Sequence, residues 1–233
     1  MYHKAVLFDL DGTLIDSGPG ILKAVKDTLK ILDYAELDDG FIRSCIGPPI
    51  GDSIGRKAGY TNEQIRRFYE TFRPIYKEKY LMDCTVYPGI IPLLEELGSE
   101  GVRLGVATNK REDYAGLLLR NIGLYDYFDT VNAMDATGTL RKSDLIRKCL
   151  EDLQTGLDDA VMIGDSDSDM DAAAECGVSF IAVGYGFGFD EEPGGTAYCR
   201  TVCDLREFLR RCRIIHPQYH RRNPLRRRSP CPS

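Results

Sequence analysis

Two aspartates near the N-terminus stand where a hydrophobic run meets a turn. In the segment VLFDLDGTLIDSG (6–18), Asp9 and Asp11 are two residues apart and Gly12 follows them. Side chains alternate along a strand, so both carboxylates would point to one side if the strand continued, and the glycine permits a sharp bend. Holding two anions together costs free energy. The pair therefore predicts a bound metal ion, a transferred proton, or both.

The apolar pattern of the chain predicts the elements that position these carboxylates. Short strand-like runs alternate with helix-like stretches, which indicates β-α-β units and a mainly parallel sheet with helices on both faces. The expected fold class is therefore α/β, with a doubly wound sheet. The predicted strands are 4–9, 102–108, 127–133, 160–165 and 178–184, with helices near 111–122, 142–154 and 167–176.

One long interval of the chain has no convincing strand pattern. Residues 21–32 and 63–81 have helical periodicity instead. We therefore predict an α-helical domain of residues 17–84, inserted after the first strand, and an α/β core formed by residues 1–16 and 85–209.

Polar residues stand at the ends of several predicted strands, and ligands of open parallel sheets bind beyond the carboxyl ends of the strands. Each such residue taken singly also fits a turn or a helix N-cap. Together they bring carboxylates, a hydroxyl, an amide and one ammonium group to one edge, which favours a functional site. The segments are Asp9-Leu10-Asp11, Thr108-Asn109, Lys142 and GDSDSD (164–169).

In this order, the four segments resemble the motifs of the haloacid dehalogenase-like superfamily of phosphotransferases. The family pattern D-x-D-G-T corresponds to DLDGT (9–13), and the strand-closing Thr or Ser corresponds to VATN (106–109). The third motif, a Lys, corresponds to Lys142, and G-D-x-x-x-D corresponds to residues 164–169. The resemblance covers residues 4–209.

Other segments narrow the resemblance. FDLDGTLIDS, IGPPIGDS (46–53) and YPGI (87–90) are similar to the phosphoglycolate phosphatase-like group, which also contains nucleotidases and sugar-phosphate phosphatases. The predicted helical insert stands where one cap type of this family is found. The resemblance therefore implies an enzyme that acts on a small phosphorylated metabolite, with the cap selecting the substrate.

The implied reaction is Mg²⁺-dependent hydrolysis of a phosphomonoester through an aspartyl-phosphate. Asp9 would be the nucleophile, and Asp11 would protonate the leaving group and then activate water. Mg²⁺ would bind the Asp9 carboxylate, the Asp11 backbone carbonyl and Asp165. Lys142 and the Thr108 hydroxyl would stabilise the transferred phosphoryl group.

The remaining site residues have supporting roles in this scheme. Backbone N–H groups around Leu10 and Asn109 would cradle the phosphoryl oxygens. Asp169 is expected to support the metal shell or orient Lys142 rather than act directly, and direct ligation stays open. Asp167 is read as a solvent-facing residue, and Arg43, near the IGPPI loop, as either a substrate-binding residue or a surface residue.

Other functions use similar residues. A phosphomutase on the same scaffold would pass the phosphoryl group to a sugar hydroxyl instead of water. A receiver-like signalling module also has an acidic cluster, a Thr or Ser and a Lys, but its motifs come in a different order and it lacks the helical insert. A dehalogenase is disfavoured because displacing halide needs neither Mg²⁺ nor the proton donor Asp11.

Charge is uneven along the chain. Residues 206–233 contain nine arginines and one acidic residue, Glu207, although the whole chain has a net charge of −6. We predict that residues 210–233 form a basic, disordered tail. The acidic remainder argues against extended nucleic-acid binding.

The sequence has no run of about 18 apolar residues and no export signal at its start, so we expect a cytoplasmic protein that does not enter membranes. Eight cysteines scattered through such a chain indicate reduced thiols. Five residues near the C-terminus have the types of zinc ligands without the spacing of common zinc sites, and structural thiols are favoured over a metal there. They are Cys199, Cys203, Cys212, His216 and His220.

Overall fold

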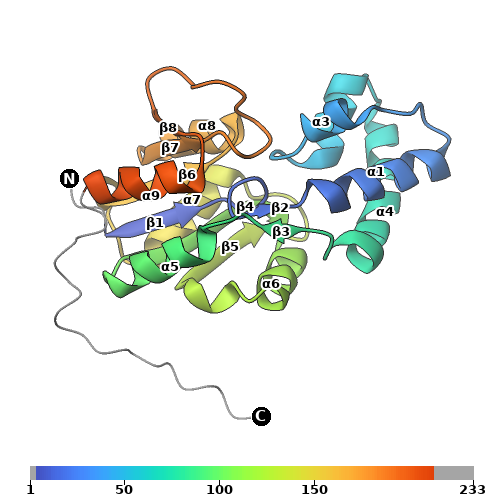
Figure 1. Cartoon of the computed structure of the whole chain (residues 1–233). Helices are drawn as coiled ribbons and strands as arrows, with labels where there is room; N and C mark the ends of the chain where they lie inside the picture. Colours follow the sequence, from blue (N-terminus) through green and yellow to red (C-terminus); the bar gives the residue numbers. More distant parts are fainter. Residues whose placement is uncertain (1–3, 213–233) are drawn as a thin grey trace, which may run out of the picture.

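The computed structural model describes residues 4–212. Its centre is a six-stranded sheet with the order β5-β4-β1-β6-β7-β8, in which all neighbouring strands run parallel (Figure 1). The five strands expected from the sequence are present and β8 is additional, so the predicted doubly wound α/β fold is confirmed. The strands are β1 (Ala5–Phe8), β4 (Arg103–Arg111), β5 (Thr130–Met134), β6 (Ala160–Gly164), β7 (Ser179–Val183) and β8 (Ala197–Cys199).

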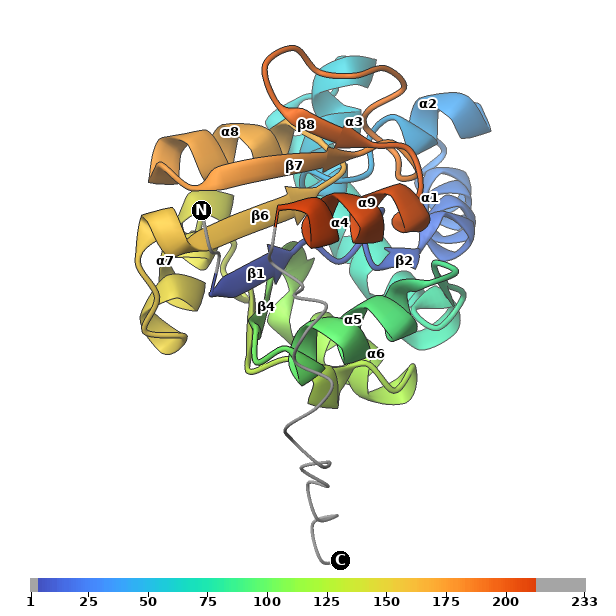
Figure 2. The same cartoon turned by 60° about the vertical axis from the view of Figure 1, so that its left-hand side comes forward.

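Helices cover both faces of the sheet (Figure 2). They are α5 (Ile90–Ser99), α6 (Glu112–Asn121), α7 (Lys142–Asp152), α8 (Asp167–Cys176) and α9 (Val202–Arg211), with short 3-10 turns η2 (Tyr125–Tyr127) and η3 (Leu157–Asp159). Val6 and Phe8 of β1 belong to the same core as α5, α6 and α9, whereas Ala5 and Leu7 pack with α7 and α8. Because side chains alternate along a strand, the next residue on the α7 face is Asp9.

β1 is the point where the winding of the sheet reverses. β4 and β5 lie on one side of it and β6, β7 and β8 on the other. The connections that follow these strands therefore diverge above the carboxyl end of β1, which is where open α/β sheets bind ligands.

Residues 18–80, which we call the helical interval, contain only helices and loops. Its elements are α1 (Gly18–Leu32), α2 (Asp39–Arg43), α3 (Ile50–Ala58), α4 (Asn62–Ile75) and a π-helical turn η1 (Tyr76–Tyr80). They lie together beside the sheet (Figure 1). The chain leaves and re-enters the core through an antiparallel pair, β2 (Ile15–Asp16) and β3 (Thr85–Val86).

Local sequence explains where α4 begins and why it changes character. Thr61 caps its N-terminus, with reciprocal hydrogen bonds to Gln64 that form a capping box. Pro74 near the other end lacks a backbone N–H, and the helix widens into η1 two residues later. The first residue of η1 is Tyr76, which contacts the candidate site.

The last described helix, α9, ends two residues beyond the expected core boundary. Arg210 of α9 pairs with Glu96 of α5 at 2.6 Å. The rest of the predicted basic tail, from residue 213 onward, lies outside the described residues. Between residues 4 and 212, no helix combines the length and the apolar character needed to cross a bilayer.

Candidate active site

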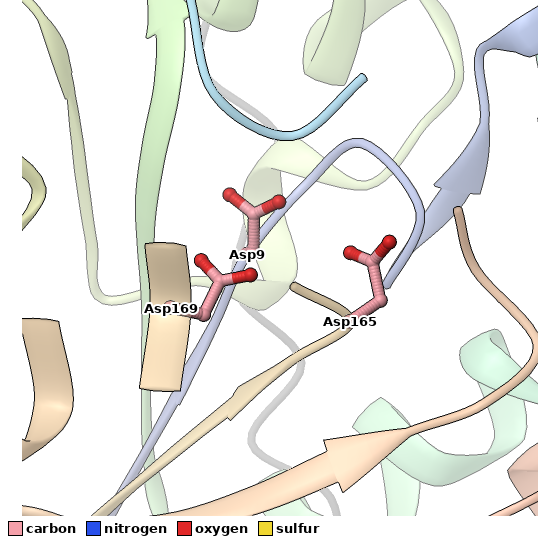
Figure 3. Close-up of side chains that lie close together, drawn as sticks. All are labelled: Asp9, Asp165 and Asp169. Carbon is pink, nitrogen blue, oxygen red and sulfur yellow. The ribbon is translucent and has the colours of Figure 1, made fainter. Parts of the chain in front are cut away.

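Three buried aspartates converge at the carboxyl edge of the sheet (Figure 3). Asp9 follows β1, Asp165 follows β6, and Asp169 lies in the first turn of α8. One carboxylate oxygen from each lies within 4.8 Å of the others. Carboxylate oxygens gathered this closely could together hold a divalent cation. The donor set, all oxygen, also fits Mg²⁺.

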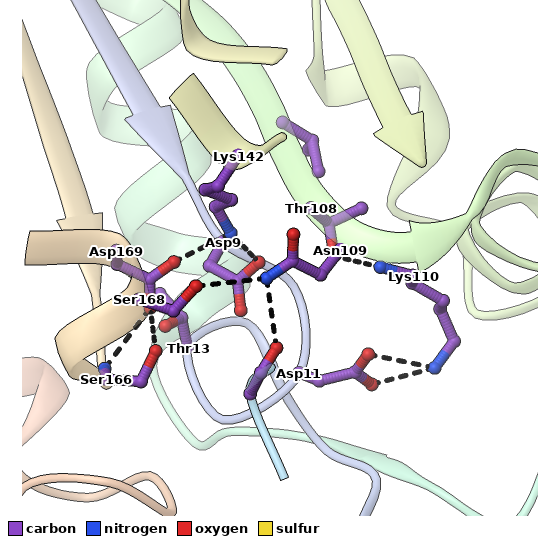
Figure 4. Close-up of polar contacts among 12 residues, drawn as sticks. Asp9, Asp11, Thr13, Thr108, Asn109, Lys110, Lys142, Ser166, Ser168 and Asp169 are labelled. Carbon is purple, nitrogen blue, oxygen red and sulfur yellow. Dashed lines mark hydrogen bonds and ion pairs between the residues drawn. The ribbon is translucent and has the colours of Figure 1, made fainter. Parts of the chain in front are cut away.

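Lys142 lies between two of these aspartates. Its Nζ is 2.5 Å from Asp9 Oδ1 and 2.7 Å from Asp169 Oδ1, and its side chain is 5% exposed. Lys142 is the first residue of α7, the helix that covers the Ala5 and Leu7 face of β1, which is why it meets Asp9. Asp169 also accepts hydrogen bonds from the backbone N–H and hydroxyl of Ser166 (Figure 4). Both oxygens of Asp169 are thus engaged in orienting its neighbours.

The charges of this cluster do not balance. Three carboxylates face one ammonium group, which leaves two negative charges if all are ionised. Burial raises the pKa of Asp9 to about 7, although the ion pair with Lys142 opposes the shift. Burial and the neighbouring Asp169 and Asp9 carboxylates raise the pKa of Asp165 well above its usual value. A divalent cation would remove this excess.

Asp165 is held by groups from two other loops. Its Oδ1 accepts a hydrogen bond from the Thr13 hydroxyl at 3.0 Å, and its Oδ2 accepts one from the Phe187 backbone N–H at 2.8 Å. Gly12 is required beside it, because its φ is +90° and a Cβ there would lie 2.2 Å from Asp165 Oδ2. The D-x-D-G-T segment therefore packs directly against the aspartate that follows β6.

Asp11 does not join the three aspartates. Lys110 Nζ donates to both of its carboxylate oxygens, at 2.9 and 3.0 Å, and to the Tyr76 hydroxyl at 2.9 Å. Burial alone would lower the pKa of Lys110, but Asp11 and Tyr76 outweigh it and hold that pKa above its usual value. For Tyr76, burial disfavours the charged phenolate and raises the pKa to about 12. The hydrogen bond between Lys110 and Tyr76 thus connects β4 of the core to the helical interval.

Sequence reasoning missed Lys110. β4 was expected to end at Thr108, but it continues to Arg111 through a bulge: Thr108 pairs with Ala133 and Arg111 with Met134. The intervening residues, Asn109 and Lys110, are turned out of the ladder toward the site. The signal available in the sequence was a lysine directly after the strand-closing Thr-Asn pair.

Three residues with proposed phosphate contacts follow β1 or belong to β4, and Figure 4 labels two of them, Thr108 and Asn109. Thr108 is buried, and its hydroxyl oxygen accepts the Lys110 backbone N–H at 3.1 Å. Asn109 donates its side-chain amide to the Gly47 carbonyl and the Ser168 hydroxyl, each at 3.2 Å. The side chain of Leu10 is fully buried in the core, so only its backbone can face a ligand.

Other candidates lie outside this cluster. Asp167 is exposed, and Arg43 is exposed at the end of α2, beside Gly18. Cys199 is buried and Cys203 exposed, while His216 and His220 fall outside the described residues. Among residues 4–212, the only group of three potential metal ligands is Asp9, Asp165 and Asp169.

A cavity of about 290 Å³ adjoins the site on the side of the helical interval. Asp11, Asn109 and Lys110 line it on the core side, whereas Arg43 does not line it. The rest of its wall combines aromatic, aliphatic and charged side chains of the helical interval, β4, α6 and the loop after β5.

Comparison with known proteins identifies the family of this arrangement. Residues 6–183 match the model of the family described as haloacid dehalogenase-like hydrolase. The chain is 37% identical over 199 residues to a phosphoglycolate phosphatase of Rhodospirillum rubrum, covering 79% of this chain and 80% of the relative. It is 33% identical to a 5'-nucleotidase of Pseudomonas aeruginosa, covering 89% of this chain and 96% of that protein.

Solved structures agree with the sequence comparison. The crystal structure of a predicted phosphatase from Clostridium acetobutylicum superposes with a TM-score of 0.85 at 34% identity, covering 91% of this chain and all of the other. The likeness therefore extends over the helical interval as well as the sheet.

Proposed function

Because the chain belongs to the haloacid dehalogenase-like hydrolase family, and is a phosphoric monoester hydrolase of that family, we propose that it cleaves small phosphomonoesters through an aspartyl-phosphate on Asp9. The observation that carries the proposal is the cluster of three buried aspartates around Lys142, at the switch point of a parallel sheet. The phosphatase names of its relatives do not favour the phosphomutase alternative.

Bound Mg²⁺ would offset the excess negative charge and let a phosphate dianion approach Asp9, held by the Asp9 and Asp165 carboxylates and the Asp11 carbonyl. Asp9 attacks phosphorus, a P–O bond to Asp9 forms, and the bond to the leaving alcohol breaks. Asp11, protonated, gives its proton to the departing oxygen.

The second step reverses these roles. Asp11 takes a proton from water, whose oxygen attacks phosphorus and breaks the bond to Asp9, releasing inorganic phosphate. Lys142 orients Asp9 and adds positive charge beside the phosphoryl oxygens. Asp169 positions Lys142, which its ion pair of 2.7 Å supports.

We further propose that residues 17–84 act as a cap that closes over the site and excludes water. The paired connections β2 and β3 would allow such movement, since only two residues of each are paired. Tyr76 of the proposed cap contacts Lys110, so movement of the cap would shift Lys110 and change its ion pair with Asp11.

Phosphate release from a panel of phosphomonoesters, measured with Mg²⁺ and with excess chelator, tests the proposal. We expect turnover only with Mg²⁺, and inhibition by Ca²⁺, whose coordination is larger and looser. Full turnover in chelator would contradict the metal requirement, and transfer of the phosphoryl group to a sugar hydroxyl rather than water would identify a mutase.

A further inference from the structure

The cavity beside Asp11 has a continuous wall on α4 and η1. Tyr69, Phe72, Arg73 and Tyr76 all line it, and their spacing of three or four residues places them on one helix face. Tyr76 contacts Lys110, the partner of Asp11, so this end of the wall adjoins the proposed proton donor. At about 1.5 Å per residue along the helix axis, Arg73 lies roughly 4.5 Å from Tyr76, and Tyr69 lies roughly 10 Å from it.

Arg73 differs from the other cations of the cavity. Lys110 is paired with Asp11, and Arg111 is paired with Asp113 at 3.0 Å. The Arg73 guanidinium instead lies 4.8 Å from the centre of the Tyr69 ring, and no carboxylate among residues 4–212 lies within ion-pair distance of it. Its N–H donors are therefore available to a ligand.

The Tyr69 ring under Arg73 is fixed in place. Its hydroxyl donates to Asp52 Oδ2 at 2.9 Å and accepts the Asp52 backbone N–H at 3.1 Å. Tyr114 and Ile46 add further apolar surface to the same cavity. Rings of this kind favour a flat partner, which can stack on them or meet their edges.

The size of the cavity limits the leaving group. Its volume of about 290 Å³ lies just below the range of roughly 300–1,000 Å³ that is typical of small-molecule sites. A two-carbon acid would leave most of that volume, including its aromatic side chains, in contact with water, whereas a sugar bearing a flat ring would fill it.

Taking the proposed hydrolase function as its basis, we propose that the substrate is a nucleoside monophosphate, with Arg73 as a specificity-determining residue. The phosphate faces Asp9, the sugar passes Tyr76, and the base reaches the pair formed by Arg73 and Tyr69. The Arg73 guanidinium donates hydrogen bonds to acceptor atoms of the base, and the flat ring of the base stacks against aromatic side chains of the cavity.

The test compares kcat/KM for nucleoside 5'-monophosphates and 2-phosphoglycolate in the full-length protein with Mg²⁺. Acetyl phosphate, whose leaving group is too small to reach Arg73, serves as the reference substrate. We expect nucleotides to exceed 2-phosphoglycolate by about 10-fold or more, the discrimination that one hydrogen bond to a charged group provides. Preference for 2-phosphoglycolate would overturn the inference.

Two variants test the residue. Arg73→Met keeps the length of the side chain without its donors, so KM for nucleotides should rise about 10-fold or more while acetyl phosphate turnover is unchanged. Arg67→Met is the matched control, since Arg67 is an exposed residue of the same helix that does not line the cavity. Equal effects of Arg73→Met on nucleotides and acetyl phosphate, or no effect on either, would contradict the assigned role.

Failure of the two proposals can be told apart. If acetyl phosphate and every other phosphate compound are left intact by folded protein with Mg²⁺, the hydrolase function itself is wrong. If acetyl phosphate is hydrolysed but nucleotides are not, only the substrate class is wrong. Should Arg73→Met fail to fold, Arg73→Lys keeps the charge but loses the planar fork, and a selective rise in nucleotide KM is again expected.

Discussion

Lys110 Nζ lies within 3.0 Å of both side-chain oxygens of Asp11, and the side chains of this ion pair are 4% and 13% exposed. Both side-chain oxygens of Asp11 are therefore occupied by the ammonium group of Lys110. In the proposed reaction Asp11 must therefore exchange Lys110 for the leaving group. Tyr76 of the helical interval contacts the same ammonium group, so movement of that interval would affect the exchange.

Substitution of the two aspartates should separate their roles. We expect Asp9→Asn to remove essentially all turnover, because an amide is a very poor nucleophile. Asp11→Asn should lower kcat by about 10²- to 10⁴-fold, the usual contribution of a general acid–base group. Steady-state phosphate release measures both, with circular dichroism as the control for folding. Near-normal turnover of Asp9→Asn would assign the nucleophile to another residue.

The loss caused by Asp11→Asn should depend on the leaving group. A nitrophenolate departs with little help from an acid, so formation of the aspartyl-phosphate from nitrophenyl phosphate should be nearly normal. Hydrolysis of that intermediate still lacks its base, and phosphorylated Asp9 should accumulate. Rapid quenching and peptide mapping detect it. Label found on Asp11 instead would show that the roles are reversed.

Removing Lys142 should destabilise the fold strongly. Lys142→Met leaves Asp9 and Asp169 buried without their ammonium partner, and we expect a loss of about 3–5 kcal/mol in the free energy of unfolding. Urea denaturation in chelator measures it. Lys4→Met is the control, because the pair with Asp159 is exposed and should contribute about 1 kcal/mol or less. Equal effects of both substitutions would contradict the central role of the buried pair.

The metal-free protein should lose stability as the pH rises from about 4 to 7. An unfolded aspartate titrates near pH 4, whereas burial raises the pKa of Asp9 to about 7 in the folded protein. Between these values the folded state binds more protons, so the free energy of unfolding falls with rising pH. Asp165 shifts in the same direction. Melting temperatures in chelator should show the slope in the native chain and a smaller one in Asp9→Asn; identical slopes would exclude Asp9 as its source.

Mg²⁺ should stabilise the folded protein through the same cluster. A ligand present at 100 times its Kd adds about 2.7 kcal/mol to the free energy of unfolding, so the melting temperature should rise with Mg²⁺ concentration. Asp165→Asn should abolish most of the rise, whereas Asp167→Asn, at an exposed position of the same segment, should not. A rise that survives Asp165→Asn would place the ion elsewhere.

The sequence alone determined the sheet and most of the site. Hydrophobic periodicity located the strands, and in a parallel sheet polar residues that follow strands must meet at one edge. Asp9, Lys142 and Asp165 were predicted on this basis, and the structure brings them together. Local signals sufficed because each of these residues belongs to an element whose place in the sheet follows from the β-α-β pattern.

The tertiary structure alone decided which charges are paired. Lys110 is 99 residues from Asp11 and 34 from Tyr76, and a bulge in β4 turns it toward both. Arg73 could not be chosen over Arg43 from the sequence, since only the packing of α4 against the core placed one of them in the cavity. The periodicity of the sequence indicates which face of a helix or strand is buried. It does not indicate which distant side chain lies opposite that face, because this depends on how the folded elements pack together.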